Sequence, residues 1–240
     1  MYIAQQTTHG LLDSSWAMVP REVTHNQDIV NVVAHFSQGG PPQFEHIPPN
    51  ASIALGPNDI YYGLSPHPLW LTIFTAMFMH ANLLHIGGNM LYLWIFGNNI
   101  EDALGKVRFL LFYLACGALA AFAQIAIDPN SLIPTLGASG AIAGVLGAYF
   151  LLYPDARVLT IVPLFFAFLT EIRAFWVLGF WIALQLFQGF AGMGMAHGGG
   201  VAYFAHIGGF FAGLVLISLL GGRKLVNRQM RQARYTPRGY

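Results

Sequence analysis

The chain has little charge and almost no cysteine. Only 9% of its 240 residues are Asp, Glu, Lys or Arg, whereas soluble domains contain about 25%. The single cysteine, Cys116, excludes an intrachain disulfide framework and any paired-cysteine metal motif, and is read as a small buried apolar residue. A net charge of +1 gives no indication of a nucleic-acid partner. The chain does not open with a basic stretch and an apolar run, so no signal peptide is predicted.

What the chain does have is apolar surface. Hydrophobic residues make up 55% of it, and it contains 27 glycines. In water such a composition would leave large apolar patches exposed, so the lipid bilayer is the natural solvent. Glycines also suit helices that pack closely in a membrane. The sequence therefore predicts an all-α, polytopic membrane helix bundle.

Three regions are expected. Residues 1–67 carry repeated Pro and Gly turn signals and are predicted to be an extramembrane region with short elements and no large core. Residues 68–222 form the membrane domain, and residues 223–240 form a basic cytoplasmic tail. Because a span needs about 20 apolar residues, five are predicted: Leu83–Ile100, Val107–Ile127, Ser139–Tyr153, Ile172–Phe190 and Val201–Leu220. The short apolar run 158–169 is predicted to be an interfacial or partly buried loop.

Basic residues set the expected orientation. With five spans, every Lys and Arg except Arg21 falls on one side, in the loops or the tail. Basic loops favour the cytoplasm, so the C-terminus is predicted to be cytoplasmic. The Arg-rich tail is expected to hold this orientation against an anionic leaflet. It favours a bacterial plasma membrane, as does the lack of a transit peptide.

The first chemical candidate is Ser139, within the string Gly137-Ala138-Ser139-Gly140 that opens the third span. At a helix N-terminus, its backbone N–H is an unpaired donor that can stabilise an oxyanion. Alone, such a string is also typical of a helix-capping serine with packing glycines.

His206, in the last span, is the candidate base. A neutral imidazole can take the proton of a serine hydroxyl. The third span has a G-x-x-x-G face at Gly140 and Gly144, and the fifth has another at Gly209 and Gly213. If these faces meet, the backbones approach closely and bring Ser139 toward His206, although the same pattern also serves plain packing.

His85 and Asn89 form a third polar group, at the start of the first span. They are four residues apart, so both lie on one helix face. Each can donate a hydrogen bond to an oxyanion. His80 lies five residues earlier, at the predicted membrane boundary. Interhelical hydrogen bonding by Asn89 is the alternative.

Acidic residues are nearly absent from the spans, so a Ser–His dyad is more economical than a triad. The histidines lack a carboxylate ligand nearby in sequence and the chain has no H-E-x-x-H motif, so no metal site and no cofactor are predicted.

From 68 to 222 the chain resembles the rhomboid proteases. Four strings carry the resemblance, in order and in register with the spans: His80-x-x-x-x-His85-x-x-x-Asn89, Glu101-Asp102-Ala103-Leu104-Gly105, Gly137-Ala138-Ser139-Gly140 and Ala205-His206-x-x-Gly209.

The resemblance implies a compact core of six helices, with a short central helix that starts at the serine. It implies Ser139 as nucleophile and His206 as base. It also implies an oxyanion hole lined by His85, Asn89 and the Ser139 N–H, with Gly137 in the same loop. His80 and Glu101 match structural polar positions near the site. The expected partners are the bilayer and single-span or multi-span membrane-protein substrates, cleaved in or near their transmembrane segments.

Two features depart from the family pattern. No segment before residue 68 matches the family's first core helix, so the chain is expected to lack it. Ala143 stands where the family often has an aromatic residue against the histidine. The region 24–65 is expected to be an enlarged outward loop, serving as a lid or docking surface.

Two other functions fit parts of the sequence. A non-catalytic rhomboid-like protein that binds transmembrane helices would lack the serine or the histidine. A small transporter or channel would be favoured by inverted repeats, and none is seen in this sequence.

Overall fold

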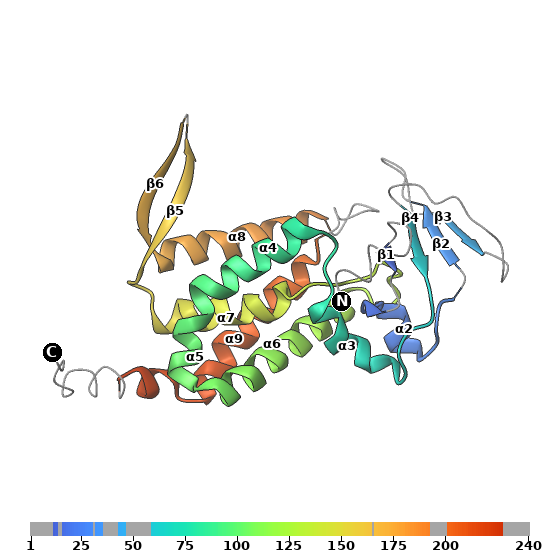
Figure 1. Cartoon of the computed structure of the whole chain (residues 1–240), viewed down its shortest axis with the longest axis horizontal. Helices are drawn as coiled ribbons and strands as arrows, with labels where there is room; N and C mark the ends of the chain where they lie inside the picture. Colours follow the sequence, from blue (N-terminus) through green and yellow to red (C-terminus); the bar gives the residue numbers. More distant parts are fainter. Residues whose placement is uncertain are drawn as a thin grey trace.

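The computed structural model describes residues 12–13, 16–30, 32–35, 43–46, 59–164, 166–192 and 201–227. They form a helical bundle with a small β-sheet at one end and a β-hairpin near the other (Figure 1). The predictions for the distal tail, and for most of the region between 36 and 58, lie outside the described residues.

Helices occupy all five apolar runs that the sequence marks as spans. They are α4 (Leu83–Tyr92), which continues through the π-helical turn η4 (Leu93–Gly97) into α5 (Asn98–Leu104), then α6 (Lys106–Ile127), α7 (Ser139–Leu152), α8 (Ala174–Gly192) and α9 (Tyr203–Leu219). A short helical approach precedes them, made of η2 (Leu69–Leu71), α3 (Thr72–Thr75) and η3 (Ala76–Phe78). The boundaries follow local signals: the Asn82 side chain caps α4 by accepting the His85 N–H at 2.8 Å, and Gly105, with φ +80°, separates α5 from α6.

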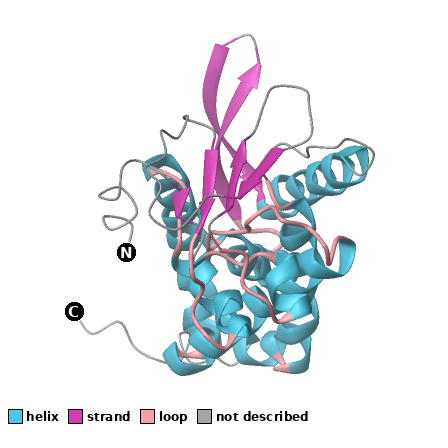
Figure 2. Ribbon diagram, turned by 90° about the vertical axis from the view of Figure 1, so that its right-hand side faces the viewer, coloured by secondary structure: helices cyan, strands magenta, loops and turns pink. Residues whose placement is uncertain are grey.

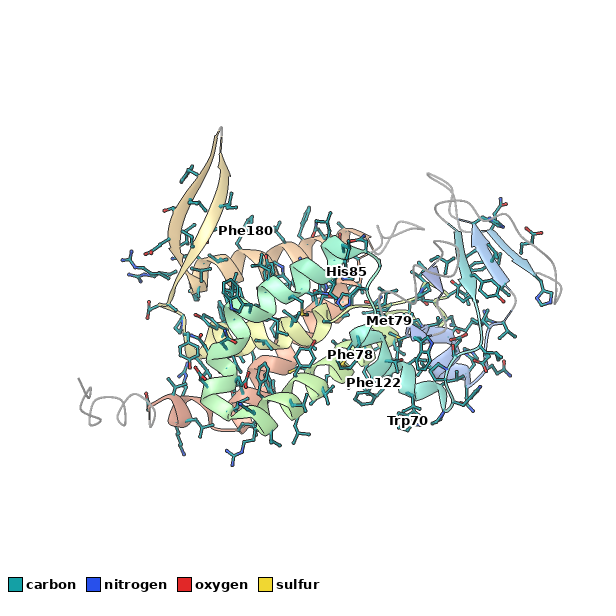
Figure 3. The ribbon with its side chains drawn as sticks, in the orientation of Figure 1. Trp70, Phe78, Met79, His85, Phe122 and Phe180 are labelled. Atoms are coloured by element: carbon teal, nitrogen blue, oxygen red, sulfur yellow. The ribbon has the colours of Figure 1, made fainter. Side chains whose placement is uncertain are left out.

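Helix length limits how many of these helices cross a membrane alone. Among the described residues, α6 and α8 are long and apolar enough, and the bent pair 69–78 and 83–104, with an angle of 81°, adds a third candidate. Helices α7 and α9 are apolar but have only 14 and 17 residues. The count of five spans is therefore not confirmed. Large apolar side chains such as Phe122 and Phe180 project from the bundle, 54% and 67% exposed, as they would toward lipid (Figure 3).

Helix α7 is the centre of the bundle. Its residues Gly140–Tyr149 are buried without interruption, and α9 crosses it at the predicted glycine faces. A Cβ atom on Gly209 would overlap the carbonyl of Gly140, and one on Gly213 would overlap that of Gly144. The two G-x-x-x-G faces therefore do meet, with direct backbone contact between the helices. Cys116 is fully buried in the same core, as predicted.

The N-terminal region contains a sheet that an all-α fold does not include. Its strands are β1 (Leu12–Asp13), β2 (Val32–His35), β3 (Gln43–His46) and β4 (Asp59–Tyr62), in the order β1-β4-β2-β3. Strand β2 is antiparallel to both β3 and β4, with Val33 opposite Glu45 and Tyr61, whereas β1 is parallel to β4. Helix α2 (Pro20–His25) packs beside it, and Val19, Ala34 and Tyr62 form a small core. Short elements with a small core agree with the prediction; the all-α class is corrected here.

A second correction concerns the run 158–169. It forms a hairpin of β5 (Arg157–Leu164) and β6 (Phe166–Arg173), with Arg157 opposite Arg173. Figure 2 shows this hairpin extending beyond the helices. Its base carries two ion pairs, Arg157–Glu171 at 3.6 Å and Arg173–Asp155 at 3.4 Å. A twelve-residue apolar run fits either a strand or a buried loop by composition alone.

Candidate active site

Ser139 is the first residue of the central helix α7. As a residue of the first turn, it has a backbone N–H without an intrahelical partner by position. Gly137 precedes it with φ +118°, a conformation that side chains rarely adopt. The Gly137 N–H donates to the Ala76 carbonyl at 2.8 Å, which fixes the turn into the helix.

The loop leading to Ser139 is fastened to the N-terminal region along its length. The bonds are Met18–Thr135, paired in both directions at 3.0 and 2.8 Å, the Arg21 N–H to the Ser131 carbonyl at 3.1 Å, Thr24 Oγ1 to the Pro129 carbonyl at 2.8 Å, and the Tyr62 hydroxyl to the Leu132 carbonyl. The loop before the serine is thus tied to segments that lie 70 to 117 residues earlier in the chain.

His206 lies in the first turns of α9 and meets Ser139. Its Nε2 is 2.8 Å from Ser139 Oγ. The glycine crossing of α7 and α9 brings the two residues together, as predicted. Gln124 of α6 also helps: its Oε1 accepts the N–H of Ala205 at 3.2 Å, one of the donors that the start of α9 leaves unpaired.

The other side of His206 is held by α8. Its Nδ1 is 2.8 Å from Oε1 of Gln185, and the Trp181 ring lies 5.9 Å from its ring at an angle of 36°. Ala143, the position where the resemblance places an aromatic, is buried and would touch a Cβ atom on Gly209. Sequence reasoning missed Gln185, Trp181 and Gln124. The available signal was a glutamine inside an apolar span, because a polar group in a membrane helix is energetically costly and is usually retained for a function.

His85 and Asn89 converge on the loop before the serine. A Cβ atom on Gly137 would lie 2.8 Å from His85 Nε2 and 3.7 Å from Asn89 Nδ2. His85 Nδ1 accepts the Ala81 N–H at 3.4 Å, so the ring proton sits on Nε2, the nitrogen that faces Gly137. Asn89 Nδ2 is buried and has no hydrogen-bond partner among the residues that the structure describes. Figure 3 labels His85 where α4 begins.

Of the two polar residues that the resemblance places near the site, His80 lies there and Glu101 does not. His80 is buried, and its ring packs edge-on against that of His85 at 5.1 Å, so it supports the site. Glu101 is in α5, near the opposite end of α7: Tyr153, just beyond α7, bonds to the Asn99 carbonyl at 3.2 Å. Since α7 has 14 residues and rises about 1.5 Å per residue, Glu101 is not brought to the site.

Chemically, the arrangement pairs a hydroxyl with a base and surrounds both with donors. The imidazole is within reach of the hydroxyl proton. The helix N-terminus, His85 Nε2–H and Asn89 Nδ2 supply donors on the side of Gly137. Such a group suits nucleophilic attack on a carbonyl and stabilisation of the resulting oxyanion.

Comparison with known proteins gives matches over most of this region. A family model described as the Rhomboid domain matches residues 67–223. Rhomboid protein 1, mitochondrial, of Saccharomyces cerevisiae is 28% identical over 219 residues, covering 78% of this chain and 60% of the relative. Rhomboid-like protein 11, chloroplastic, of Arabidopsis thaliana is 31% identical over 160 residues, covering 64% of this chain and 53% of the relative.

A third relative is named a protease. Rhomboid protease GluP of Bacillus subtilis is 40% identical over 79 residues, covering 33% of this chain and 15% of the relative. The chain thus spans less than two thirds of each of these relatives. Mitochondrial and chloroplastic names among them do not support the bacterial plasma membrane that the sequence favoured.

Proposed function

The chain belongs to the rhomboid family, and on that premise we propose that it is an intramembrane serine endopeptidase. Its substrates would be membrane proteins, cleaved in or near their transmembrane segments. The observation that carries the proposal is the 2.8 Å contact between Ser139 Oγ and His206 Nε2 at the start of the buried helix α7.

The reaction would proceed through an acyl-enzyme. Ser139 Oγ attacks the scissile carbonyl carbon while His206 Nε2 takes the hydroxyl proton. The oxyanion forms within reach of the Ser139 N–H, His85 Nε2–H and Asn89 Nδ2. Asn89 Nδ2 has no hydrogen-bond partner within the described part of the chain, which supports this role, because a buried donor without a partner is costly unless a ligand uses it. His206 then gives its proton to the leaving amine, and water repeats the sequence to release the acid.

The bundle supports a membrane setting for this chemistry. Apolar side chains cover α6 and α8, so a substrate helix can approach from the lipid. We place the C-terminus in the cytoplasm, because basic loops favour that side. The fastened loop 128–138 and the sheet lie at the Ser139 end of α7, which would put the site toward the outer face.

The test is covalent labelling of the full chain, purified in detergent, by a fluorophosphonate probe. Labelling of the wild type that disappears in Ser139→Ala and falls at least a hundredfold in His206→Ala is expected, since general-base catalysis contributes about 10²–10⁴-fold. A folded wild type that stays unlabelled would instead favour a non-catalytic protein that binds transmembrane helices. Labelling of Ser139→Ala at the wild-type rate would overturn the assignment of the nucleophile.

A further inference from the structure

Gln185 is a polar side chain in the middle of an apolar helix. Helix α8 is long and apolar enough to cross a membrane, yet Gln185 within it is buried, 9% exposed. A buried amide in a membrane helix is unfavourable unless it forms hydrogen bonds. Its Oε1 lies 2.8 Å from His206 Nδ1, on the ring edge away from Ser139.

We propose that Gln185 is a positioning residue, which holds His206 in the one neutral tautomer able to act as a base; the inference rests on the proposed function. An amide oxygen can only accept a hydrogen bond, so Nδ1 must carry the ring proton. Nε2 then has the free lone pair, and it faces the Ser139 hydroxyl. With the opposite tautomer, Nε2–H would point at the hydroxyl and no base would be available.

Gln185 keeps the same protonation state throughout the proposed reaction. When Ser139 attacks, its hydroxyl proton moves to Nε2, and Nδ1 keeps its own proton in the bond to Gln185. The imidazolium formed is stabilised by the amide dipole. When the leaving amine departs, the Nε2 proton goes to it and the starting tautomer returns.

A neutral amide suits this position better than an acid. A carboxylate would stabilise the imidazolium more strongly, but an ion buried in the bundle carries a large desolvation penalty. Gln185 fixes the ring direction and adds no formal charge. The near absence of acidic residues from the predicted spans is consistent with this, because Gln185 holds His206 in place of a carboxylate.

Trp181 completes the restraint from the same helix. It lies four residues before Gln185, so both side chains fall on one face of α8. The Trp181 ring lies 5.9 Å from the His206 ring, tilted by 36°, and 6.2 Å from the Phe210 ring. Helix α8 therefore contacts His206 through both a hydrogen bond and an aromatic ring.

The experiment compares Gln185→Leu, Gln185→Glu and Gln188→Leu in the full-length protein by the rate of fluorophosphonate labelling across pH. Gln188 is the matched control, because it lies on the same helix three residues later and is exposed. Gln185→Leu should label about ten- to a hundredfold more slowly, by analogy with the cost of removing a group that orients a metal-binding histidine. Its melting temperature should fall only by the loss of one buried hydrogen bond, and Gln188→Leu should behave as wild type.

Gln185→Glu tests the positioning role through the pH dependence of labelling, which would not change if Gln185 only stabilised the fold. It keeps an acceptor at Nδ1, so labelling near neutral pH should persist. The acidic limb of its pH–rate profile should shift upward by about one to three pH units, since a nearby carboxylate favours the imidazolium, which cannot act as base.

Wild-type labelling rates in Gln185→Leu would overturn the positioning role and leave the proposed protease intact. So would an unshifted profile in a Gln185→Glu variant that is as slow as Gln185→Leu. If the wild type itself is not labelled at Ser139, the proposed function fails first, and the two failures are thereby distinguished.

Discussion

At the scale of single residues, Gly137 combines two constraints. Its φ of +118° is strained for any side chain, and a Cβ atom there would also press on the His85 ring. We expect Gly137→Ala to destabilise the fold by about 1–3 kcal/mol, the range for strained backbone positions, and to lower Ser139 labelling by displacing His85. Thermal melting and fluorophosphonate labelling measure the two effects.

Gly87→Ala provides the control for that variant. Gly87 is in α4, two residues after His85, and a Cβ atom there would meet nothing within 4 Å. Alanine favours a helix over glycine, so this variant should melt no lower than the wild type and label equally fast. If Gly137→Ala and Gly87→Ala show the same melting temperature and labelling rate, the backbone conformation of Gly137 does not contribute to function.

Glu22 gives a pH dependence outside the candidate membrane spans. Burial raises the pKa of this carboxyl above 4.5, against the lowering effect of hydrogen bonds from the Ile29 N–H and Ser65; Asp28 raises it further and His67 lowers it. The folded state therefore holds the proton more tightly than the unfolded chain. Its stabilising contribution is complete below about pH 4.5 and is lost as the pH rises through the folded-state pKa.

The expected result is a smaller loss of stability with pH in Glu22→Gln than in the wild type, because the amide does not ionise. Melting temperatures recorded from pH 4 upward measure this difference directly. Parallel curves for the two proteins would contradict the burial effect on Glu22.

At the scale of elements, the crossing of α7 and α9 determines the site. Gly213 leaves no room for a side chain against the Gly144 carbonyl. Gly213→Val should separate the helices, destabilise the protein by about 1–3 kcal/mol through overpacking, and slow labelling because His206 moves away from Ser139. The control is Gly192→Ala, at the end of α8, where a Cβ atom meets nothing within 4 Å. A lower melting temperature for Gly213→Val with an unchanged labelling rate would mean that this crossing stabilises the fold without positioning His206.

The sequence predicts helices better than strands in this protein. Long apolar runs interrupted by Asn82, Gly105 and Asp128 locate the helices of the bundle to within a few residues. Strands of two to four residues are too short to show an alternating pattern, and β1 pairs with β4 across more than forty residues. In the hairpin 157–173, apolar residues follow one another at consecutive positions, so no alternation with a period of two can be recognised.

At the scale of the whole molecule, the N-terminal region helps to hold the loop before Ser139. Tyr62 belongs to the small core of the sheet and bonds to the Leu132 carbonyl. Tyr62→Phe removes only that bond, so we expect a loss of about 0.5–1.5 kcal/mol together with slower labelling of Ser139. Tyr92→Phe, at an exposed position of α4, is the matched control. Unaltered labelling in Tyr62→Phe would mean that the loop keeps its position without this bond.

The site itself was predictable only in part. Ser139, His206, His85 and Asn89 are marked in the sequence as polar residues within or beside apolar runs, and the glycine faces indicate which helices meet. The partners Gln185 and Trp181 depend on the rotation of α8 about its axis, which a uniformly apolar helix does not reveal. Glu101 was expected near the site because it matches the family pattern, but a match in sequence does not give its distance from Ser139.

The neutral array Gln185–His206–Ser139 also has an electrical consequence. A potential of 100 mV does about 2.3 kcal/mol of work on a unit charge that crosses the whole membrane, whose apolar core is about 30 Å thick. In the proposed mechanism the hydroxyl proton would move between Ser139 Oγ and His206 Nε2, which are 2.8 Å apart, at most a tenth of that thickness. Membrane voltage can thus change the free energy of this proton transfer by only about 0.2 kcal/mol. The chemical step should run at nearly the same rate in an energised membrane and in a depolarised one.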